Sequence, residues 1–199
     1  MINQFKFESI DLAELIGIIL GDGSFYINNG QYQFDIAFNS TENHIFFVRK
    51  LLENSTKAYI YEKSERKKLC KHLRICQKPA VLELLSKTTK KAGDKITNQV
   101  TIPKWILKNK KFLKACVRGL IDTDGSVYRL KPHWPNLFQI SFKNNNKVLL
   151  RDTREAFVKL GYNPSKVFGN RFVLTRQQEI IKYFKDIGTH NPKVDSPLV

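Results

Sequence analysis

The chain has 199 residues, of which 42% are hydrophobic and 26% charged, a globular balance that excludes a largely disordered protein. Lys and Arg number 34 against 18 Asp and Glu, so the net charge is +16. An excess of this size favours a polyanionic partner, with nucleic acid as the first candidate and an anionic membrane as the second.

The predicted elements of the first half begin with a helix that ends at Gly23, a residue type that commonly follows helix ends. A capping box is expected near its start, because Glu14 lies three residues after Asp11. Alternating strands follow at 24–28 and 32–39 around Asn29-Gly30, a favoured hairpin turn. A helix at 42–52, strands at 58–63 and 69–76, and a helix from about 80 to 90 complete this half.

The second half is predicted to repeat this order. Its motif helix leads into strands near 126–130 and 137–143, a helix at 146–160, strands near Val167 and at 171–175, and a last helix at 177–186. A polar stretch containing Gly93 and Pro103 separates the halves and is typical of a linker. The predicted fold class is therefore α+β, with two αββαββα halves at 1–90 and 105–199 and a linker at 91–104.

One motif occurs twice. Residues 15–26 are LIGIILGDGSFY and residues 117–128 are VRGLIDTDGSVY, with a period of 124 − 22 = 102. Small residues lie one turn apart in both copies and would let two helix backbones approach closely, although ordinary core helices can show the same spacing. These residues are Gly17 and Gly21 in the first motif helix, and Ala115, Gly119 and Thr123 in the second.

Close packing alone does not explain Asp22 and Asp124. Each is predicted at the C-terminal end of a helix, where the helix dipole disfavours a carboxylate by roughly 0.3–1 kcal/mol. Two such ends placed together add repulsion between the carboxylates, which a bound cation would remove. Mg²⁺ typically takes one or two carboxylates and can support phosphodiester hydrolysis. A single Asp-Gly is usually only a turn, so the matched pair is the sharper signal.

These residues resemble the LAGLIDADG homing endonucleases, specifically the monomeric class with two motif copies. GLIDTDGS at 119–126 is close to the family consensus, whereas GIILGDGS at 17–24 is looser and has Leu20 where an acidic residue is common. The resemblance covers nearly the whole chain. It assigns Asp22 and Asp124 to the metal, together with the preceding Gly21 and Thr123, and implies Mg²⁺ as the cofactor, with Mn²⁺ or Ca²⁺ able to substitute in binding.

The resemblance also implies an architecture and a reaction. The motif helices would form the interface between the halves, and each half would add a four-stranded antiparallel sheet to a saddle over the DNA major groove. Members of the family cut both strands across the minor groove, usually for a mobile intron or intein. The initial Met and the lack of a splicing junction favour a free-standing or intron-encoded enzyme. We therefore expect a monomer acting on a long, near-unique double-stranded DNA target.

Strand alternation predicts which face of each sheet would meet DNA, although any antiparallel sheet has a solvated polar face. The predicted outer-face residues can read base edges in the major groove. They are Ser24, Tyr26, Asn28, Gln33, Asp35, His72 and Arg74 in the first half, and Ser126, Tyr128, Gln139, Ser141 and Arg171 in the second. A basic hairpin region is expected to contact phosphates, which makes binding salt-sensitive; it comprises Lys63, Arg66, Lys67, Lys68 and Lys71.

The family resemblance further places a polar or basic side chain near each metal, to position water or stabilise the transition state. Alignment with the family gives Asn39 and Lys143 at one such position, and Lys78 and Arg176 near another. The alternative is that these are ordinary surface residues at strand ends. The four histidines show no paired spacing of a metal or nuclease motif and are interpreted as structural or surface residues.

Two other functions compete with the nuclease. A relative that has lost cleavage could act as an RNA maturase or a DNA-binding regulator, but the presence of both aspartates favours the enzyme. A basic structural or ribosome-associated protein with an accidental repeat would show no dependence on metal.

Cysteine usage and the apolar runs bear on localisation. Cys70, Cys76 and Cys116 are an odd number at no metal-ligand spacing, which suggests neither zinc nor a disulfide framework. The longest apolar run, 15–20, is far shorter than the roughly 20 residues of a membrane span, and the N-terminus lacks a signal-peptide pattern. We expect a soluble intracellular protein of the cytoplasm or an organelle, without membrane contact.

Overall fold

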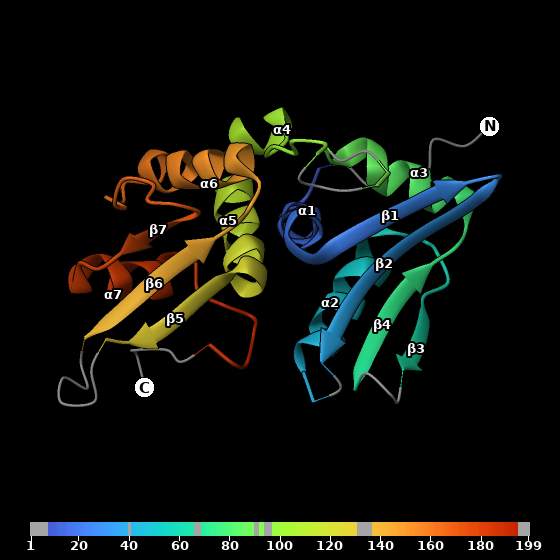
Figure 1. Cartoon of the computed structure of the whole chain (residues 1–199), viewed down its shortest axis with the longest axis horizontal. Helices are drawn as coiled ribbons and strands as arrows, with labels where there is room; N and C mark the ends of the chain where they lie inside the picture. The colour runs from blue at the N-terminus through green and yellow to red at the C-terminus, as the bar shows by residue number, and fades with distance from the viewer. Residues whose placement is uncertain are drawn as a thin grey trace.

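The computed structural model describes residues 8–39, 41–65, 69–89, 92–93, 97–130 and 137–194. Two helices, α1 (Ile10–Asp22) and α5 (Lys110–Asp124), pack side by side at the centre, with one sheet on each side of the pair (Figure 1). The two motif copies therefore meet along their helices. No helix in these described ranges has the length and apolar character needed to cross a bilayer.

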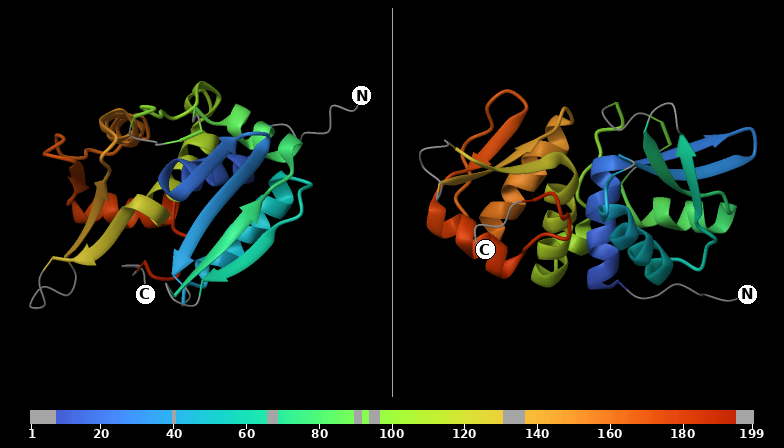
Figure 2. Two further views of the ribbon diagram at one scale, coloured as in Figure 1. Left: turned by 45° about the vertical axis from the view of Figure 1, so that its right-hand side comes forward. Right: turned by 90° about the horizontal axis from the view of Figure 1, so that it is seen from below.

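In the first half, α1 leads directly into β1 (Gly23–Asn28) and β2 (Gln31–Asn39). These strands form an antiparallel sheet with β4 (Cys70–Ile75) and β3 (Tyr61–Glu65), in the order β1-β2-β4-β3. Helices α2 (His44–Ser55) and α3 (Lys78–Lys87) lie on the apolar side of this sheet (Figure 2). Alternate residues of the central strands are buried there, including Phe34, Ile36, Leu73 and Ile75.

In the second half, the short helix α4 (Lys104–Leu107) precedes α5, which leads into β5 (Gly125–Arg129). The sheet continues with β6 (Phe138–Lys143) and β7 (Arg171–Leu174), in the order β5-β6-β7. Helices α6 (Lys147–Lys159) and α7 (Gln177–Asp186) pack against this sheet. The predicted α+β organisation in two similar halves is confirmed.

The strand expected near Val167 is a correction to the predicted sheet. Among the described residues, this segment forms only an isolated bridge between Phe168 and Arg171. The Ser165 N–H donates to the carbonyl of Val173 at 2.8 Å, but the Val173 N–H donates at 3.1 Å to the Ser165 hydroxyl instead of to a backbone carbonyl. A side chain thus interrupts the ladder, and the second sheet has three strands where four were expected.

The start and end of α1 rest on contacts other than those predicted. Its N-cap is Ser9, whose hydroxyl accepts the N–H of Leu12 at 3.1 Å, while Glu14 turns into the helix interface and does not form the expected capping box. The helix does end at Gly23, but the φ of this residue is −70°, which any residue can adopt. Glycine is needed because a Cβ there would lie 2.9 Å from the Ile19 carbonyl oxygen.

Small residues allow α1 and α5 to touch through their backbones. A Cβ on Gly17 would lie 2.2 Å from the carbonyl oxygen of Cys116, and one on Gly119 would lie 2.4 Å from that of Glu14. Neither distance is compatible with a side chain. The expected close approach of the two motif helices is therefore confirmed.

The segment between the halves is attached to both of them. The Trp105 indole N–H donates to the Lys87 carbonyl at 3.1 Å, at the end of α3. On the other side, the Asn146 side chain donates to the Val100 carbonyl at 2.9 Å, and Val100 itself is buried. The described part of the predicted linker thus contributes to the core of the second half.

Candidate nucleic-acid interface and metal site

Asp22 and Asp124 are the last residues of α1 and α5. The two helix ends are adjacent, because a Cβ on Gly21 would lie 2.1 Å from Thr123 Oγ1 and 3.4 Å from Asp124 Oδ2. The Thr123 hydroxyl donates within its own helix, at 3.0 Å to the Gly119 carbonyl. Asp22 is exposed and Asp124 is half-buried. Two carboxyl-bearing helix ends from distant parts of the chain therefore lie together.

Asn144 holds one of these carboxylates. Its buried side chain donates from Nδ2 to Asp124 Oδ2 at 2.7 Å, and its Oδ1 accepts the N–H of Asn146 at 2.8 Å. Its own N–H donates to the Asn170 carbonyl at 2.9 Å. Sequence analysis missed this residue. The available signal was the run of three asparagines between β6 and α6, a position where asparagine commonly caps a helix.

The register of the second sheet places two basic residues in line with Asp124. Gly125 follows Asp124 and pairs with Phe142, so Lys143 is the next residue of β6 toward the helix end. Lys143 pairs in turn with Arg171 of β7, and both side chains are exposed. Neighbouring strands lie about 4.8 Å apart, so these cations are roughly one and two strand spacings from the line of the carboxylate.

In the first half, the strand register places residues other than Asn39 and Lys78 in line with Asp22. Gly23 pairs with Ile36, so the next residue of β2 in line with Asp22 is Ala37, which pairs with His72. Ala37 is thus the register counterpart of Lys143, and His72 is that of Arg171.

Asn39 lies two residues beyond Ala37, which corrects its alignment with Lys143. Its Oδ1 accepts the N–H of Thr41 at 3.2 Å and the Thr41 hydroxyl at 3.1 Å. The side chain of Asn39 is therefore engaged in the turn that precedes α2.

Lys78 is the first residue of α3 and Arg176 is the N-cap of α7, so both lie after β4 and β7, toward the ends of the sheets far from the motif aspartates. Lys78 Nζ lies over the Tyr32 ring, 4.9 Å from its centroid, and Tyr32 is roughly 13 Å along β2 from the residue opposite Gly23. Arg176 pairs with Glu179 at 3.4 Å. Their expected closeness to the aspartates is thus a second correction, because both residues follow the strands instead of belonging to them.

Asp35 organises the outer face of the first sheet. Its Oδ2 lies 2.8 Å from Nδ1 of His72, and its Oδ1 accepts from Nε of Arg74 at 3.2 Å. The Ser24 hydroxyl donates to the Asp35 carbonyl at 3.3 Å, and the neighbouring Tyr26 is half exposed. This carboxylate therefore fixes two potential base-reading side chains in defined orientations.

Most residues predicted to contact DNA lie on the outer faces, as the strand parity requires. Two do not fit. Ser141 is buried, because its short side chain sits on the central strand between Ser126 and Val173. Lys71 has the parity of the buried Leu73 and lies 3.9 Å from Glu62. The residues on the outer faces are Ser24, Tyr26, Asn28, Gln33, Asp35, Lys63, His72 and Arg74 in the first half, and Ser126, Tyr128, Gln139, Lys143 and Arg171 in the second. Arg66, Lys67 and Lys68 fall outside the described residues.

A buried ion pair joins the two motif helices. Arg118 of α5 donates to Glu14 of α1 at 2.9 and 2.5 Å and to the Ile187 carbonyl at 2.7 Å. His190 Nδ1 lies 2.6 Å from the same carboxylate. Burial raises the pKa of Glu14, but the bonds and charges of His190 and Arg118 outweigh it and hold this pKa below its usual value. The ion pair ties the halves together, and the histidine that was interpreted as structural contributes to it.

The segment after α7 is anchored on Asp122. This carboxylate accepts the Thr189 hydroxyl at 2.5 Å and the His190 N–H at 2.8 Å. Burial raises the pKa of Asp122 to about 6, against the lowering effect of these two bonds. Further along, Lys193 Nζ donates to Glu42 at 2.7 Å, so the segment reaches the first half.

Comparison with known proteins agrees with this geometry. A family model described as a LAGLIDADG-like domain matches residues 111–179, which contain the consensus-like motif but not the looser copy. A search of curated proteins gives no match.

Solved structures match nearly the whole chain. I-DmoI in complex with DNA and Mn gives a TM-score of 0.62 at 19% identity, covering 90% of this chain and 96% of that one. The homing endonuclease I-WcaI bound to its DNA recognition sequence gives 0.58 at 12% identity, covering 92% and 82%. Full-length WhiA from Thermatoga maritima gives 0.57 at 13% identity, covering 93% and 58%. Residues 111–179 therefore match the model of a LAGLIDADG-like domain, and most of the chain shares the fold of these solved structures.

Proposed function

We propose that this chain is a site-specific DNA endonuclease that binds double-stranded DNA as a monomer and cuts both strands with a divalent cation held by Asp22 and Asp124. The supporting observation is the meeting of two carboxyl-bearing helix ends between two polar sheet faces. Structures of the same fold, I-DmoI and I-WcaI, contain bound DNA, and that of I-DmoI also contains Mn.

The duplex would lie across the outer faces of both sheets. These faces are free of the covering helices and carry amides, hydroxyls and cations that can reach base edges and phosphates. Asp35 keeps Arg74 oriented on the first face. A side chain held by a neighbour loses less conformational entropy on binding, so this arrangement favours selective base contacts.

The donor set suits a hard divalent cation, and Mg²⁺ is the expected one. The described residues hold no group of three or more His, Cys, Asp or Glu side chains that could enclose a metal. Mg²⁺ usually takes one or two carboxylates and completes its shell with water and phosphate oxygens, which matches Asp22 and Asp124 facing a DNA backbone. The backbone carbonyls at the ends of α1 and α5 would add Gly21 and Thr123 as further ligands. When bound, the cation lowers the pKa of the attacking water and neutralises charge on the departing oxygen.

The chain's own residues would position the phosphate. Asn144 restricts the orientation of Asp124 by its hydrogen bond. Lys143 and Arg171, in line with that carboxylate, would place positive charge beside the phosphate where negative charge develops. His72 stands at the corresponding position of the first half, which makes it a better candidate there than Asn39 or Lys78.

A nucleic-acid-binding protein without cleavage activity, such as a maturase or a regulator, is the alternative on the same fold. It needs the basic charge and the sheets but has no use for two acidic helix ends placed together. The presence of both aspartates favours the enzyme.

The test begins with selection of cleaved sites from a random duplex library in Mg²⁺. On the selected site, Asp22→Asn and Asp124→Asn should each reduce cleavage by more than about 100-fold, beyond the usual effect of losing an outer hydrogen bond to a metal ligand. Binding to the same duplex in Ca²⁺ should stay within about threefold. Asp11→Asn is the matched control, because Asp11 is exposed at the other end of α1, and it should cut normally.

Two results would reject the nuclease. A wild-type protein that binds duplex DNA but cuts none of the library in Mg²⁺ or Mn²⁺ supports the non-cleaving alternative. Normal cutting by the Asp22→Asn/Asp124→Asn double variant would remove these residues from the reaction.

A further inference from the structure

One charged row crosses the outer face of the first sheet. Asp35 of β2 stands opposite Ser24 of β1 on one side and opposite Arg74 of β4 on the other. Tyr61 of β3 completes the row beside Arg74. Arg74 alternates with buried residues of β4, so its side chain points to the outer face, which is the face proposed for duplex DNA. The row therefore places one carboxylate and one guanidinium side by side on that face.

Asp35 binds one edge of the Arg74 guanidinium. Its Oδ1 accepts from Nε at 3.2 Å, and its Oδ2 accepts from Nη2 at 3.4 Å. Nη1 donates to none of the described residues, so the end of the fork formed by Nη1 and the second hydrogen of Nη2 is available to a ligand. His72 Nδ1 lies 2.8 Å from Oδ2 and holds the carboxylate from its other side. The available end of Arg74 is therefore fixed in one direction.

The pairing distinguishes Arg74 from cations that attract DNA through charge alone. The net charge of +16 already favours a polyanion without this residue. A carboxylate on a DNA-binding face opposes that attraction, and here it neutralises the guanidinium beside it. The pair instead supplies hydrogen-bond donors of fixed direction, which lose less conformational entropy when they bind. This property favours a contact with a base edge, which carries sequence information, over a contact with a phosphate.

The available end of the guanidinium matches one base edge of the major groove. Guanine presents two neighbouring acceptors, N7 and O6, to two parallel donors. Adenine presents one acceptor beside a donor, cytosine presents a donor, and thymine presents one acceptor and a methyl group. Two donors aimed at any of these three would leave at least one donor without an acceptor, which is costly once water is excluded.

The equivalent row of the second sheet lacks this pair. The register places Ser126 of β5 opposite Ser141 of β6, and Ser141 opposite Val173 of β7. These three residues are the counterparts of the row on the first sheet, counted from the glycine that follows each motif aspartate. Ser141 is buried and Val173 carries no side-chain donor, so this row has no two-donor fork. The two halves therefore differ at equivalent places on their outer faces.

We propose that Arg74, positioned by Asp35, recognises a guanine in the major groove of the first half-site, and that the equivalent base pair of the second half-site is not recognised in this way. The inference rests on the proposed duplex site and adds to it one base identity and one asymmetry of the target. Arg74 determines specificity, and Asp35 is a positioning residue that acts through it.

The test measures binding specificity, which does not require cleavage. Duplexes bound by the full chain in Ca²⁺ are selected from a random library, and the selection is repeated with Arg74→Lys, which keeps the charge but lacks the planar fork. The wild-type protein should prefer guanine at one position by about 5- to 150-fold, the range for one good bidentate contact. Arg74→Lys should lose the preference at this position alone. Replacing that guanine by 7-deazaguanine, which lacks the N7 acceptor, should weaken binding by wild type but not by Arg74→Lys.

Asp35→Asn separates positioning from a general structural role, because the two predict different signs. Without the carboxylate, Arg74 can turn toward a phosphate. Affinity for non-target duplex should then rise, and the salt slope should steepen by up to about 0.9, the value for one phosphate contact on B-DNA. The preference for guanine should fall by at least about threefold. Weaker binding to every duplex with an unchanged preference would overturn the role of Asp35.

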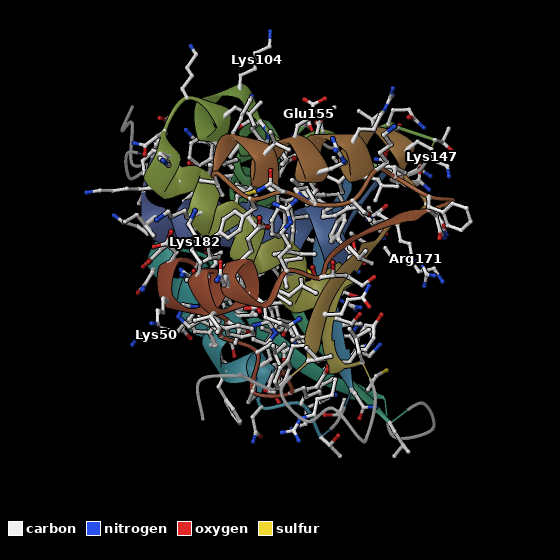
Figure 3. The ribbon with its side chains drawn as sticks, turned by 90° about the vertical axis from the view of Figure 1, so that its left-hand side faces the viewer. Lys50, Lys104, Lys147, Glu155, Arg171 and Lys182 are labelled. Atoms are coloured by element: carbon white, nitrogen blue, oxygen red, sulfur yellow. The ribbon has the colours of Figure 1, made fainter. Side chains whose placement is uncertain are left out.

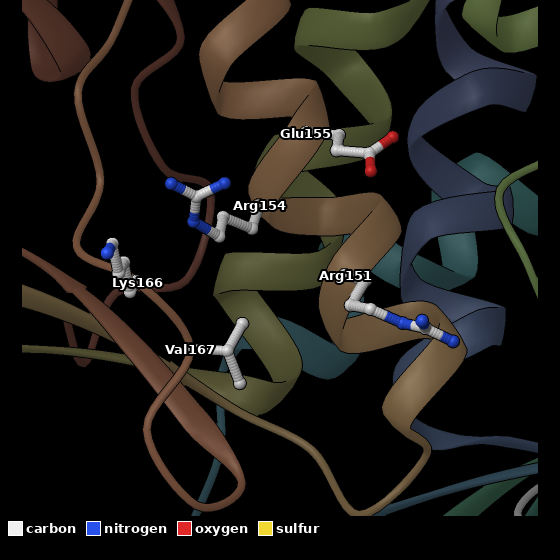
Figure 4. A pocket seen from close by; sticks show the side chains of 5 residues that line it. All are labelled: Arg151, Arg154, Glu155, Lys166 and Val167. Atoms are coloured by element: carbon white, nitrogen blue, oxygen red, sulfur yellow. The ribbon is translucent and has the colours of Figure 1, made fainter.

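Arg154→Lys is the matched control. Arg154 is also half-buried, and its Nε is also held, by the Ser165 carbonyl at 2.7 Å. It lines a surface cavity of about 410 Å³ on α6 (Figure 4). Figure 3 shows the next residue of α6, Glu155, and Arg171 of the sheet face pointing in different directions. Arg154→Lys should therefore leave every base preference unchanged.

Three results would overturn the inference while leaving the duplex site in place. They are an unchanged guanine preference in Arg74→Lys, a preference that 7-deazaguanine does not weaken, and an equally strong guanine preference at the symmetry-related pair of the second half-site. A wild-type protein that selects no duplex would overturn the proposed function together with the inference.

Discussion

Replacing Arg118 by Met tests the ion pair between the motif helices. The Glu14 side chain is only 2% exposed, and Arg118 donates to both of its oxygens. Met keeps most of the side-chain volume but removes the charge, which leaves a buried carboxylate with His190 as its remaining side-chain partner. The Ile187 carbonyl would also lose its hydrogen bond from Arg118.

The expected loss in the free energy of unfolding is a large fraction of the stability of an ordinary protein. Removing one partner of a buried pair typically costs about 3–5 kcal/mol. His190 is 41% exposed and keeps its 2.6 Å contact with Glu14, so a value near the lower end, about 3 kcal/mol, is expected at pH 7. With a urea dependence of about 2 kcal/mol per molar, the unfolding midpoint should fall by about 1.5 M.

The loss should also depend on pH in a defined direction. The wild-type pKa of Glu14 is lowered, so its stabilising effect is present above the unfolded pKa, near the usual 4.5, and is lost as the pH falls through the folded value. In the variant, burial without Arg118 pushes this pKa upward, and protonation at low pH relieves the unpaired charge. The two stability curves should therefore diverge toward pH 7 and converge toward pH 4.

Urea unfolding followed by circular dichroism at pH 7 and pH 4 measures both effects. The Glu14→Gln/Arg118→Met double variant removes both charges and should regain at least about 2 kcal/mol at pH 7, because neutral replacement of a buried pair is often nearly neutral in stability. A single variant within about 1 kcal/mol of wild type at pH 7, or a double variant no more stable than the single one, would refute the reasoning.

Four further outcomes are expected. Gly17→Ala should lower the free energy of unfolding by about 1–3 kcal/mol, since its Cβ would lie 2.2 Å from the Cys116 carbonyl oxygen. Thermal unfolding measures this as a lower melting temperature. For Asp122, a folded pKa of about 6 against an ordinary value of 3.8 means that stability is lost as the pH rises through this window. Asp122→Asn should therefore gain up to about 3 kcal/mol relative to wild type between pH 4 and pH 7 in urea unfolding. Lys143→Met should abolish cleavage of the selected site and leave gel-shift affinity nearly intact. Asn144→Ala should slow the cutting of one strand more than the other, visible as accumulated nicked plasmid, because its hydrogen bond reaches one of the two motif aspartates.

The features that the sequence predicted well depend on local pattern or on repetition. Period-two alternation in β2 and β6 separates buried from outer residues, because successive side chains point to opposite faces of a sheet. The duplicated motif indicates two equivalent helices, and glycine at matching positions indicates that their backbones touch, as Gly17 and Gly119 do. Neither inference needs knowledge of distant contacts.

The features that were mispredicted depend on partners far away in the chain. Glu14 has the spacing of a capping box with Asp11, but its partner Arg118 lies 104 residues later and gives the carboxylate a stronger, charge-assisted bond. The equivalence of Asn39 and Lys143 failed for a related reason. Residue counts from the motifs do not fix which residues stand opposite each other across a hairpin, whereas the register does.

The two motifs differ at the corresponding positions Leu20 and Asp122, and the difference matches the different segments that follow the last helix of each half. Both positions are buried, and a carboxylate is tolerated there only with donors. At Asp122 the donors come from the segment after α7, which folds back across the helix pair. The segment after α3 instead joins the halves, where the Trp105 indole N–H donates to the Lys87 carbonyl. The acid of the second motif thus anchors a segment that follows its own half, while the aspartate two residues later remains at the helix end. Under the proposed function the two carboxylates of the second motif have separate tasks, and Leu20 in the looser copy leaves the proposed metal site intact.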